Sequence, residues 1–482
     1  MIDIRPVAHV MGILTAALGV LMLLPAFVDW SAGNDNWMVF VSCAAVTVLC
    51  GALSALATID SDAHGLTTRQ AFLLTVATWA ILPGFGALPF YLAGLPGGWT
   101  HAFFEAMSGV TTTGTTVYSG LDELARGLLL WRSILQWLGG LGIIIVALVF
   151  LPVMRVGGMQ YFRAEAFDTM GKVMPRALDI SSALLQTYLI LTAAAGIIYM
   201  ALGMSGFDAA NHAMTTIATG GFSTSDQSFA KFSAGAEYAG AVLMVLAGLP
   251  FIRYVQLVNG SVAPLYRDIQ VRAFLRWIVY AVGAVIAYRV VTSDADLGDI
   301  LRESFFNVVS LFTGTGYGTA DVSAWGDFPL VVVLVVGFVG ACTASTGCSL
   351  KVFRYLVLFE AIRARIFQLR HPNRVVQIRL GGRVVEDDVI RSVMVLFTVF
   401  IAGYIILAVL LTLTGLETRT ALTGAWTAIC NIGPAFGPEV GATGAVDGFP
   451  QAAKWLMILG MFLGRLELVA VLVLLLPRFW KG

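Results

Sequence analysis

The run Thr315-Gly316-Tyr317-Gly318 stands where a short apolar helix, FFNVVSLF, is expected to end. A tyrosine flanked by glycines in an apolar chain suggests backbone carbonyl oxygens that face an ion. Such oxygens replace the hydration shell of a cation without adding a fixed charge, and glycine lets several backbones approach one axis. The run therefore predicts cation coordination by backbone oxygens, and the alternative is a glycine-rich turn that only joins two membrane helices.

Three other stretches align with this one when Gly316 is the fixed point, and they place Gly114, Gly221 and Gly433 at the same position. The four sequences are FFEAMSGVTTTGTT, ANHAMTTIATGGFS, FFNVVSLFTGTGYG and LTGAWTAICNIGPA. Six residues before the shared glycine, each copy carries a hydroxyl group: Ser108, Thr215, Ser310 and Thr427. One polypeptide thus supplies four copies of one segment, as a ring of carbonyls around a single ion requires. The shared register disfavours the alternative of four unrelated turns.

With these four stretches the chain resembles the Trk/Ktr/HKT superfamily of potassium transporters, in particular its TrkH-type membrane subunits. The run from Thr315 to Gly318 is similar to the filter signature of potassium channels, and the likeness to the superfamily covers nearly the whole chain. The resemblance implies that potassium ions, with no organic cofactor, bind at a filter made of Thr112, Thr113, Gly114, Thr219, Gly220, Gly221, Thr315, Gly316, Asn431, Ile432 and Gly433. It also implies a homodimer and a cytoplasmic TrkA-like regulatory subunit that binds nucleotide.

The four copies differ just after the shared glycine, where the residue is Thr115, Phe222, Tyr317 or Pro434. The carbonyl rings need not be regular there, so we expect weaker ion discrimination than in a tetrameric potassium channel. In plant HKT relatives a serine at the first filter glycine is associated with sodium preference, whereas this chain has Gly114. The resemblance therefore favours potassium uptake, and a sodium or unselective cation pathway in the same fold is the alternative.

Composition places the chain in a lipid bilayer. It has 482 residues, of which 58% are hydrophobic and 12% charged, and its mean hydropathy is +0.85, too apolar for a soluble protein of this size. Its partners should therefore include membrane lipid, whereas the net charge of zero suggests no nucleic-acid partner. The five cysteines fall mostly in apolar segments and imply no disulfide framework: Cys43, Cys50, Cys342, Cys348 and Cys430.

Ten apolar runs are long enough to be predicted as membrane crossings, and the first is interpreted as a retained span. They lie near residues 7–28, 37–58, 71–92, 128–151, 183–202, 238–257, 274–291, 328–342, 390–413 and 452–477. We predict an all-α polytopic membrane protein with pseudo-fourfold symmetry, in which two extra transmembrane helices precede four repeats of outer helix, pore loop and inner helix. The expected divisions are 1–66 for the extra helices, then 67–178, 179–268, 269–388 and 389–482 for the repeats.

Charge predicts the orientation in the membrane. Most of the 29 basic residues fall on one side of the predicted crossings, so both termini are expected on the cytoplasmic side of the cytoplasmic (inner) membrane. Acidic residues follow each shared glycine on the opposite side: Asp122, Asp226, Asp321 and Glu439. They predict an acidic vestibule that concentrates cations, and the alternative is that acidic residues merely avoid the positive side.

Small residues interrupt the eighth crossing between Gly340 and Gly347, and a broken helix leaves backbone groups that need partners. The resemblance places such a loop beneath the filter as a gate. Arg465 lies near the middle of the last apolar run, too deep to reach the surface, and Glu467 should point to another face. We expect Arg465 to donate to loop carbonyls, and the alternative is a structural ion pair. The predicted gate consists of Gly340, Thr343, Ala344, Ser345, Thr346, Gly347 and Arg465.

The segment from Val375 to Val385 reads as two alternating β-type runs around Gly381-Gly382. Two adjacent glycines suit a two-residue hairpin because both turn residues need positive φ. An isolated hairpin is marginally stable in water, so it needs a partner surface. Because it lies among basic residues, it is the predicted docking site for the regulatory subunit.

Other classes of function lack their sequence features. The histidines are scattered, and HExxH, GxSxG and P-loop motifs are missing, so the chain is not expected to be an enzyme. An intramembrane enzyme would need a catalytic pair in facing helices. A substrate transporter with broken helices would show two inverted repeats, whereas the four copies run in one direction.

Overall fold

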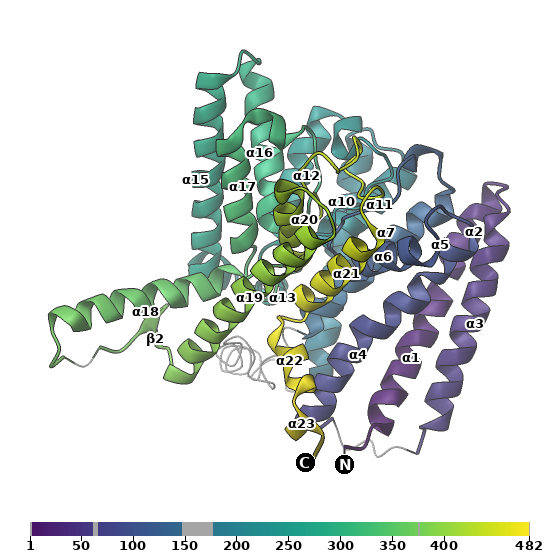
Figure 1. Ribbon diagram of the computed structural model, residues 1–482, viewed down its shortest axis with the longest axis horizontal. Helices are drawn as coiled ribbons and strands as arrows, with labels where there is room; N and C mark the ends of the chain where they lie inside the picture. The colour runs from purple at the N-terminus through teal and green to yellow at the C-terminus, as the bar shows by residue number, and fades with distance from the viewer. Residues whose placement is uncertain (1, 61–65, 147–176, 375, 482) are drawn as a thin grey trace.

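The computed structural model describes residues 2–60, 66–146, 177–374 and 376–481, whose regular secondary structure is almost entirely helical. The two termini lie beside each other at one end of the molecule (Figure 1). The predicted all-α polytopic membrane fold is confirmed by these helices. The divisions predicted between the repeats stay a prediction.

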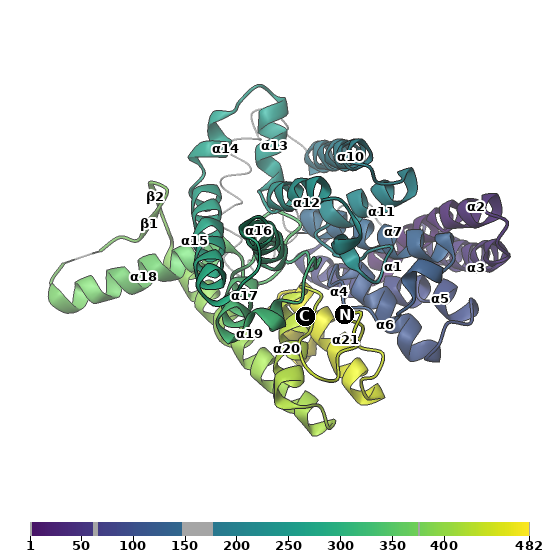
Figure 2. The ribbon, with the colours of Figure 1, turned by 90° about the horizontal axis from the view of Figure 1, so that it is seen from above.

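The N-terminal pair of crossings consists of α1 (Arg5–Leu21), continued by α2 (Leu23–Ser31), and α3 (Asn36–Ala57). These helices stand at the edge of the bundle, far from α18 (Figures 1 and 2). Their backbones meet closely, because a methyl group on Gly51 would overlap with the backbone of Ala16. Small residues at such contacts are typical of helices that pack in membranes.

The rest of the described chain repeats the order outer helix, pore helix and inner helix four times, and the pore helices are α6, α11, α16 and α20. The first repeat contains α4 (Thr68–Gly86), α5 (Leu88–Leu92), α6 (Gly98–Val110) and α7 (Arg126–Ile145); the second α10 (Ala177–Ala201), α11 (Gly206–Ile217), α12 (Ala234–Ala247) and α13 (Phe251–Val258). The third contains α14 (Ala263–Arg267), α15 (Ile269–Thr292), α16 (Leu297–Thr313), α17 (Asp327–Val339) and α18 (Val352–Arg370); the fourth α19 (Asp387–Leu413), α20 (Thr418–Cys430), α21 (Gln451–Arg465), α22 (Val469–Leu475) and α23 (Pro477–Lys481). Short 3-10 turns follow three of the pore segments: η1 (Leu121–Glu123), η3 (Ser228–Lys231) and η4 (Val322–Trp325).

In the described part of the chain, seven helices are long and apolar enough to cross a membrane, and α17 is a shorter apolar helix. Two further spans are sharply bent: α12 and α13 meet at 92°, and α21 and α22 at 105°. These two bends, in the sixth and tenth predicted crossings, were not predicted from the sequence. Gly248 and Pro250 explain the first bend, since Pro250 directly precedes α13.

The last apolar run is also not one helix, so the expected mid-helix position of Arg465 is wrong. Helix α21 ends at Arg465, and the chain turns through Glu467 and Leu468, whose φ angles are 59° and 44°. Non-glycine residues adopt this left-handed conformation only where surrounding contacts impose it. An uninterrupted run of apolar residues gives no signal for such a turn.

The predicted hairpin is present, although its strands are short. Strand β1 (Arg379–Leu380) pairs antiparallel with β2 (Arg383–Val384), and the turn glycines Gly381 and Gly382 have φ angles of 58° and 86°. Residue 375, the first of the predicted hairpin, lies outside the described residues. The hairpin contacts α18, and both project sideways from the bundle (Figure 2).

We predict that Gly51→Leu destabilises the N-terminal helix pair by about 1–3 kcal/mol, the usual cost of overpacking. The leucine would force α1 and α3 apart at their closest backbone contact. Gly84→Leu is the control, because a side chain at Gly84 would meet open space in α4. Thermal unfolding in detergent should give a lower Tm for Gly51→Leu than for Gly84→Leu, and equal Tm values would contradict the prediction.

Candidate functional site

The four shared glycines meet in a closed ring. Gly114, Gly221, Gly316 and Gly433 all have positive φ, at 89°, 79°, 85° and 108°. A methyl group on any of the first three would overlap with the carbonyl oxygen that precedes the glycine of the next copy; these oxygens belong to Gly220, Thr315 and Ile432. A methyl group on Gly433 would lie 3.0 Å from the Thr113 oxygen, which closes the circle. We call these four glycines and the four carbonyls before them the glycine ring.

Each copy is tied to its own pore helix by the same backbone hydrogen bond. The N–H of the residue before the glycine donates to the carbonyl of the hydroxyl-bearing residue near the end of α6, α11, α16 or α20. The pairs are Thr113 to Ser108 at 2.9 Å, Gly220 to Thr215 at 2.8 Å, Thr315 to Ser310 at 2.9 Å and Ile432 to Thr427 at 3.2 Å. The repetition found in the sequence is therefore also a repetition of backbone geometry.

The remaining predicted filter residues lie one step before the ring. Thr112, Thr219 and Asn431 have φ angles of 52°, 49° and 53°, and Gly314 takes the same place in the third copy with a φ of 80°. Positive φ at this position and again at the ring glycine makes the backbone alternate in direction in all four copies. The carboxyl ends of all four pore helices lead into these segments, so their negative dipole ends face the ring.

The four hydroxyl groups found six residues before the shared glycines do not make the same contacts. Ser310 Oγ donates to the Tyr317 carbonyl at 2.8 Å, and Thr427 Oγ1 accepts the N–H of Gly433 at 2.9 Å. Thr215 Oγ1 instead meets the Tyr317 hydroxyl at 2.5 Å. Ser108 Oγ has no hydrogen-bond partner among the described residues. The ring is thus regular in backbone and irregular in the side chains behind it.

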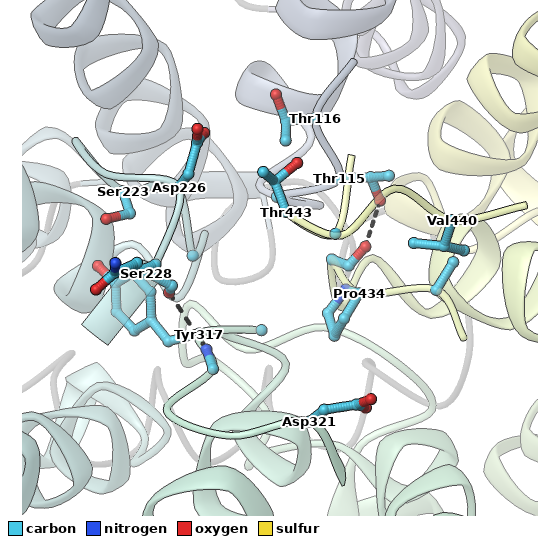
Figure 3. Close-up of a pocket in the computed structure, with 18 of the residues that line it drawn as sticks. Thr115, Thr116, Ser223, Asp226, Ser228, Tyr317, Asp321, Pro434, Val440 and Thr443 are labelled. Atoms are coloured by element: carbon cyan, nitrogen blue, oxygen red, sulfur yellow. Dashed lines mark hydrogen bonds between the residues drawn. The ribbon is translucent and has the colours of Figure 1, made fainter. Parts of the chain in front are cut away.

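A cavity of about 570 Å³ opens on one side of the ring and is lined by all four ring glycines and the residues that follow them. Asp226 and Asp321 line it (Figure 3). Thr115 Oγ1 donates to the Gly433 carbonyl at 2.6 Å, so one oxygen at this level already has a donor. This cavity is the candidate vestibule.

Two of the four acidic residues predicted for the vestibule, Asp122 and Glu439, do not line the cavity. Asp122 forms an ion pair of 2.9 Å with Lys231, and Glu439 binds the Glu417 N–H and the Thr420 hydroxyl. Partial burial raises the pKa of Asp122, but hydrogen bonds from Lys231 and Ser225 outweigh it and leave the pKa below its usual value. Asp122 and Glu439 therefore hold loops in place, and only part of the predicted acidic lining faces the cavity.

A buried ion pair that was not predicted from the sequence lies behind the ring. Arg132 of α7 binds Glu105 of α6 at 2.8 Å, and its guanidinium stacks on the Phe222 ring at 4.1 Å. Glu105 also accepts hydrogen bonds from the Thr116 hydroxyl and the Val117 N–H. The pair therefore ties together the chain after the ring in the first two copies. A glutamate and an arginine inside apolar runs were the available signal.

The chain between α17 and α18, from Gly340 to Lys351, forms the loop that we call the gate loop. Helices of the second and third repeats hold the predicted gate residues. The Thr343 N–H donates to Gln270 at 3.1 Å, and the Ala344 carbonyl accepts the Phe251 N–H at 2.9 Å. Thr346 Oγ1 donates to the Ala247 carbonyl at 3.1 Å, whereas Ser345 Oγ donates to the Cys342 carbonyl within the loop. Gly340 and Gly347 leave no room for a Cβ, which would overlap with the carbonyl oxygen of Cys348 or of Thr313. The contact between Gln270 and this loop was not predicted from the sequence.

The gate loop lies next to the segments that lead into the ring. Cys348 Sγ is 3.6 Å from Thr112 Oγ1, and Ser349 Oγ donates to the Cys430 carbonyl at 3.2 Å. A methyl group on Gly347 would lie 2.9 Å from the Thr313 carbonyl. The loop thus contacts the pore segments of the first, third and fourth copies, on the side opposite the cavity.

Arg465 reaches the gate loop, but not through the expected carbonyls. Its Nη1 lies 2.5 Å from Cys348 Sγ, and its Nη2 donates to the Gly139 carbonyl of α7 at 3.1 Å. The expectation that it binds carbonyls of Gly340 to Gly347 is replaced by a bridge between Cys348 and the first repeat. Glu467 instead pairs with Arg354 of α18 at 2.6 Å, and no ion pair of the described residues includes Arg465.

The chain was compared with known proteins. A family model described as TrkH, a cation transport protein, matches residues 37–481. The chain is 37% identical to the Trk system potassium uptake protein TrkI of Halomonas elongata, over 99% of this chain and 97% of that protein. It is 33% identical to the Trk system potassium uptake protein TrkH of Escherichia coli K12, over 99% of both chains.

A solved structure agrees over the same length. The crystal structure of the potassium transporter TrkH from Vibrio parahaemolyticus matches with a TM-score of 0.91 and 32% sequence identity, and the match covers 100% of both chains. The resemblance drawn from the four glycine stretches is therefore confirmed. This multi-pass helical membrane chain belongs to the TrkH family of cation transport proteins, which are transporters and not enzymes.

Proposed function

We propose that this chain takes up potassium across the cytoplasmic membrane through the glycine ring. The observation that carries the proposal is the closed contact of four glycines with four carbonyls, one from each copy. A ring of backbone oxygens at the ends of four pore helices can replace the hydration shell of a monovalent cation. The relatives are named potassium uptake proteins, which supports potassium as the ion.

The predicted filter residues divide into two layers in this proposal. Oxygens of the glycine ring form one layer, and Thr112, Thr219 and Asn431 lie at the next level towards the gate loop. Gly314, which was not among the predicted filter residues, takes this place in the third copy. The irregular side chains behind the ring favour modest discrimination between potassium and sodium. A sodium or unselective pathway through the same ring is the second candidate, and the ratio of the two fluxes into liposomes decides between them.

The gate loop is proposed to close the pathway below the ring. It contacts the pore segments next to Thr112 and Thr313, on the side of the ring away from the vestibule. Arg465 holds Cys348 against the first repeat through Gly139. An ion that leaves the ring on this side therefore meets the loop and a guanidinium group.

The regulatory partner is proposed to dock on the hairpin. The hairpin and α18 project from the bundle (Figures 1 and 2), and α18 begins where the gate loop ends. A soluble subunit bound there would act on the loop through one helix. We further propose that both termini lie in the cytoplasm, since the basic residues gather on that side, and that the chain forms a homodimer, as the family resemblance implies.

Replacement of Gly316 or Gly114 by serine should lower the potassium-to-sodium flux ratio by roughly tenfold, a change of about 1.4 kcal/mol. At both positions a Cβ would overlap with the carbonyl of the next copy and distort the ring. The measurement is flux of each ion into liposomes that contain the purified protein. Gly33→Ser is the control, since this glycine also has positive φ but faces open space.

Unchanged flux ratios in both ring variants would remove these glycines from the ion pathway and refute the proposed function. A ratio that falls equally in Gly33→Ser would mean that the assay reports general damage to the protein.

Deletion of residues 379–383 should abolish co-purification of the cytoplasmic nucleotide-binding subunit, because this removes the hairpin turn and both flanking arginines. The measurement is the amount of the subunit retained on the purified membrane protein. The control is the double variant Arg5→Ala, Arg69→Ala, which also removes two basic residues but leaves the hairpin intact. Retention of the subunit at the wild-type level after the deletion would place the docking surface elsewhere.

Arg465→Ala should raise basal potassium flux several-fold without the partner, since Cys348 would lose its bridge to Gly139. Deletion of residues 344–346 should act in the same direction, because the loop would be too short to reach below the ring. The flux ratio of potassium to sodium should stay near that of the wild type in both variants.

The control is Arg289→Ala, which removes another buried arginine, paired with Glu303 in the third repeat. It should leave basal flux unchanged. If flux decreases in Arg465→Ala and in the loop deletion while both proteins remain folded and inserted, Arg465 and the loop support the structure and do not close the pathway.

A further inference from the structure

The second copy of the ring lacks a side chain that the other copies have. Directly before the ring glycine stand Thr113, Thr315 and Ile432 in three copies, but Gly220 in the second. Gly220 does not have positive φ, so its conformation does not require a glycine. Two adjacent glycines, Gly220 and Gly221, leave this part of the ring with more backbone freedom than any other copy.

Threonine side chains fix the backbone in the copies that have them. Thr113 Oγ1 lies 2.8 Å from Thr111 Oγ1 and accepts a hydrogen bond of 2.9 Å from Asn431 Nδ2. Thr315 Oγ1 lies 2.8 Å from Thr313 Oγ1. These contacts tie Thr113 and Thr315 to the ends of their own pore helices, and Thr113 also to the fourth copy. Gly220 cannot make such a contact.

Gln136 of α7 occupies the place of the missing side chain. A Cβ on Gly220 would overlap with the side-chain amide of Gln136, which is completely buried. Gln136 Nε2 donates to the Gly220 carbonyl at 2.6 Å, and its Oε1 accepts the Phe222 N–H at 3.0 Å. One amide group therefore holds the backbone on both sides of the ring glycine Gly221.

The oxygen that Gln136 binds belongs to the ring itself. The Gly220 carbonyl is the one against which Gly114 of the first copy packs. One turn earlier on α7, Arg132 donates to the Ser223 carbonyl at 2.8 Å. The same face of α7 thus positions residues 220–223, and rotation of the Gly220–Gly221 peptide would move an oxygen of the ring.

We propose that Gln136 is a specificity-determining positioning residue, whose amide replaces the side chain that the second copy lacks. The inference rests on the proposed function, since it assigns Gln136 to potassium selection at the same ring. Its removal frees a Gly-Gly backbone next to Gly114 and widens the range of oxygen positions. A ring with less fixed spacing discriminates less between potassium and sodium.

The test uses the full chain in liposomes and measures the potassium-to-sodium flux ratio for three variants. Gln136→Ala removes both hydrogen bonds and should lower the ratio by at least roughly fivefold, the effect of losing one hydrogen bond of ordinary strength. Gly220→Thr should lower it as well, because the new side chain overlaps with Gln136. The double variant Gln136→Ala, Gly220→Thr restores a threonine in the space that the glutamine leaves, and its ratio should exceed that of either single variant.

The control is Gln70→Ala. Gln70 is another buried glutamine, but it lies at the start of α4. Its amide donates to the Asp3 carbonyl at 2.8 Å and accepts from the Thr67 N–H at 2.9 Å and the Thr67 hydroxyl at 3.0 Å. Its flux ratio should equal that of the wild type. Thermal unfolding of all variants separates lost stability from lost selectivity, because a merely structural role for Gln136 would lower Tm without changing the ratio.

Gly316→Ser in the same assay separates this inference from the proposed function. If the wild type prefers potassium and Gly316→Ser loses the preference, while Gln136→Ala keeps it, only the role of Gln136 is refuted. The inference is also overturned if the flux ratio of the double variant does not exceed that of both single variants. If the wild type shows no preference, or Gly316→Ser retains it, the proposed function itself fails.

Discussion

The structure depends on backbone packing against backbone at the glycine ring. Four Cα atoms lie against four carbonyl oxygens of neighbouring copies, at distances that leave no room for a Cβ in three places and little in the fourth. Such contacts bring no side-chain packing, and glycine loses more conformational freedom on folding than any other residue. The ring therefore needs support from the elements around it. The pore helices provide it through one backbone hydrogen bond that recurs in every copy.

The side chains behind the ring differ because each copy meets a different neighbour. Tyr317 reaches from the third copy into the second, where its ring packs 4.6 Å from that of Phe229 and its hydroxyl meets Thr215. Between the first two copies the same role falls to the Glu105–Arg132 ion pair. Burying such a pair is costly unless its remaining groups are satisfied, and contacts with Thr116, Val117 and Ser223 meet that need. Pseudo-fourfold symmetry is thus a property of the backbone alone.

Sequence was sufficient where backbone conformation restricts the residue type. The positive φ of Gly316 and the turn at Gly381 and Gly382 admit few residues other than glycine, so both could be predicted. The bend after Arg465 could not, because Glu467 and Leu468 adopt left-handed conformations that only tertiary contacts explain. Side-chain contacts between distant parts of the chain could not be predicted either. Gln136 and Gln270 are ordinary polar residues until packing brings one to the ring and the other to the gate loop.

Positively charged residues beneath the ring link the gate loop to α18 and to the end of α21. Lys351 ends the loop, Arg354 follows in the first turn of α18, and Arg465 ends α21; all three are buried. Arg354 binds Glu467 in the bend after α21, so α18 and that bend are held together by an ion pair. Arg465 stands two residues before Glu467 and touches Cys348 in the loop. A displacement of α18 would therefore act on the loop at two points, at Lys351 through the chain and at Cys348 through the bend and Arg465. In the proposed pathway the guanidinium of Arg465 opposes an ion leaving the ring, and the same motion that shifts the loop would shift this group.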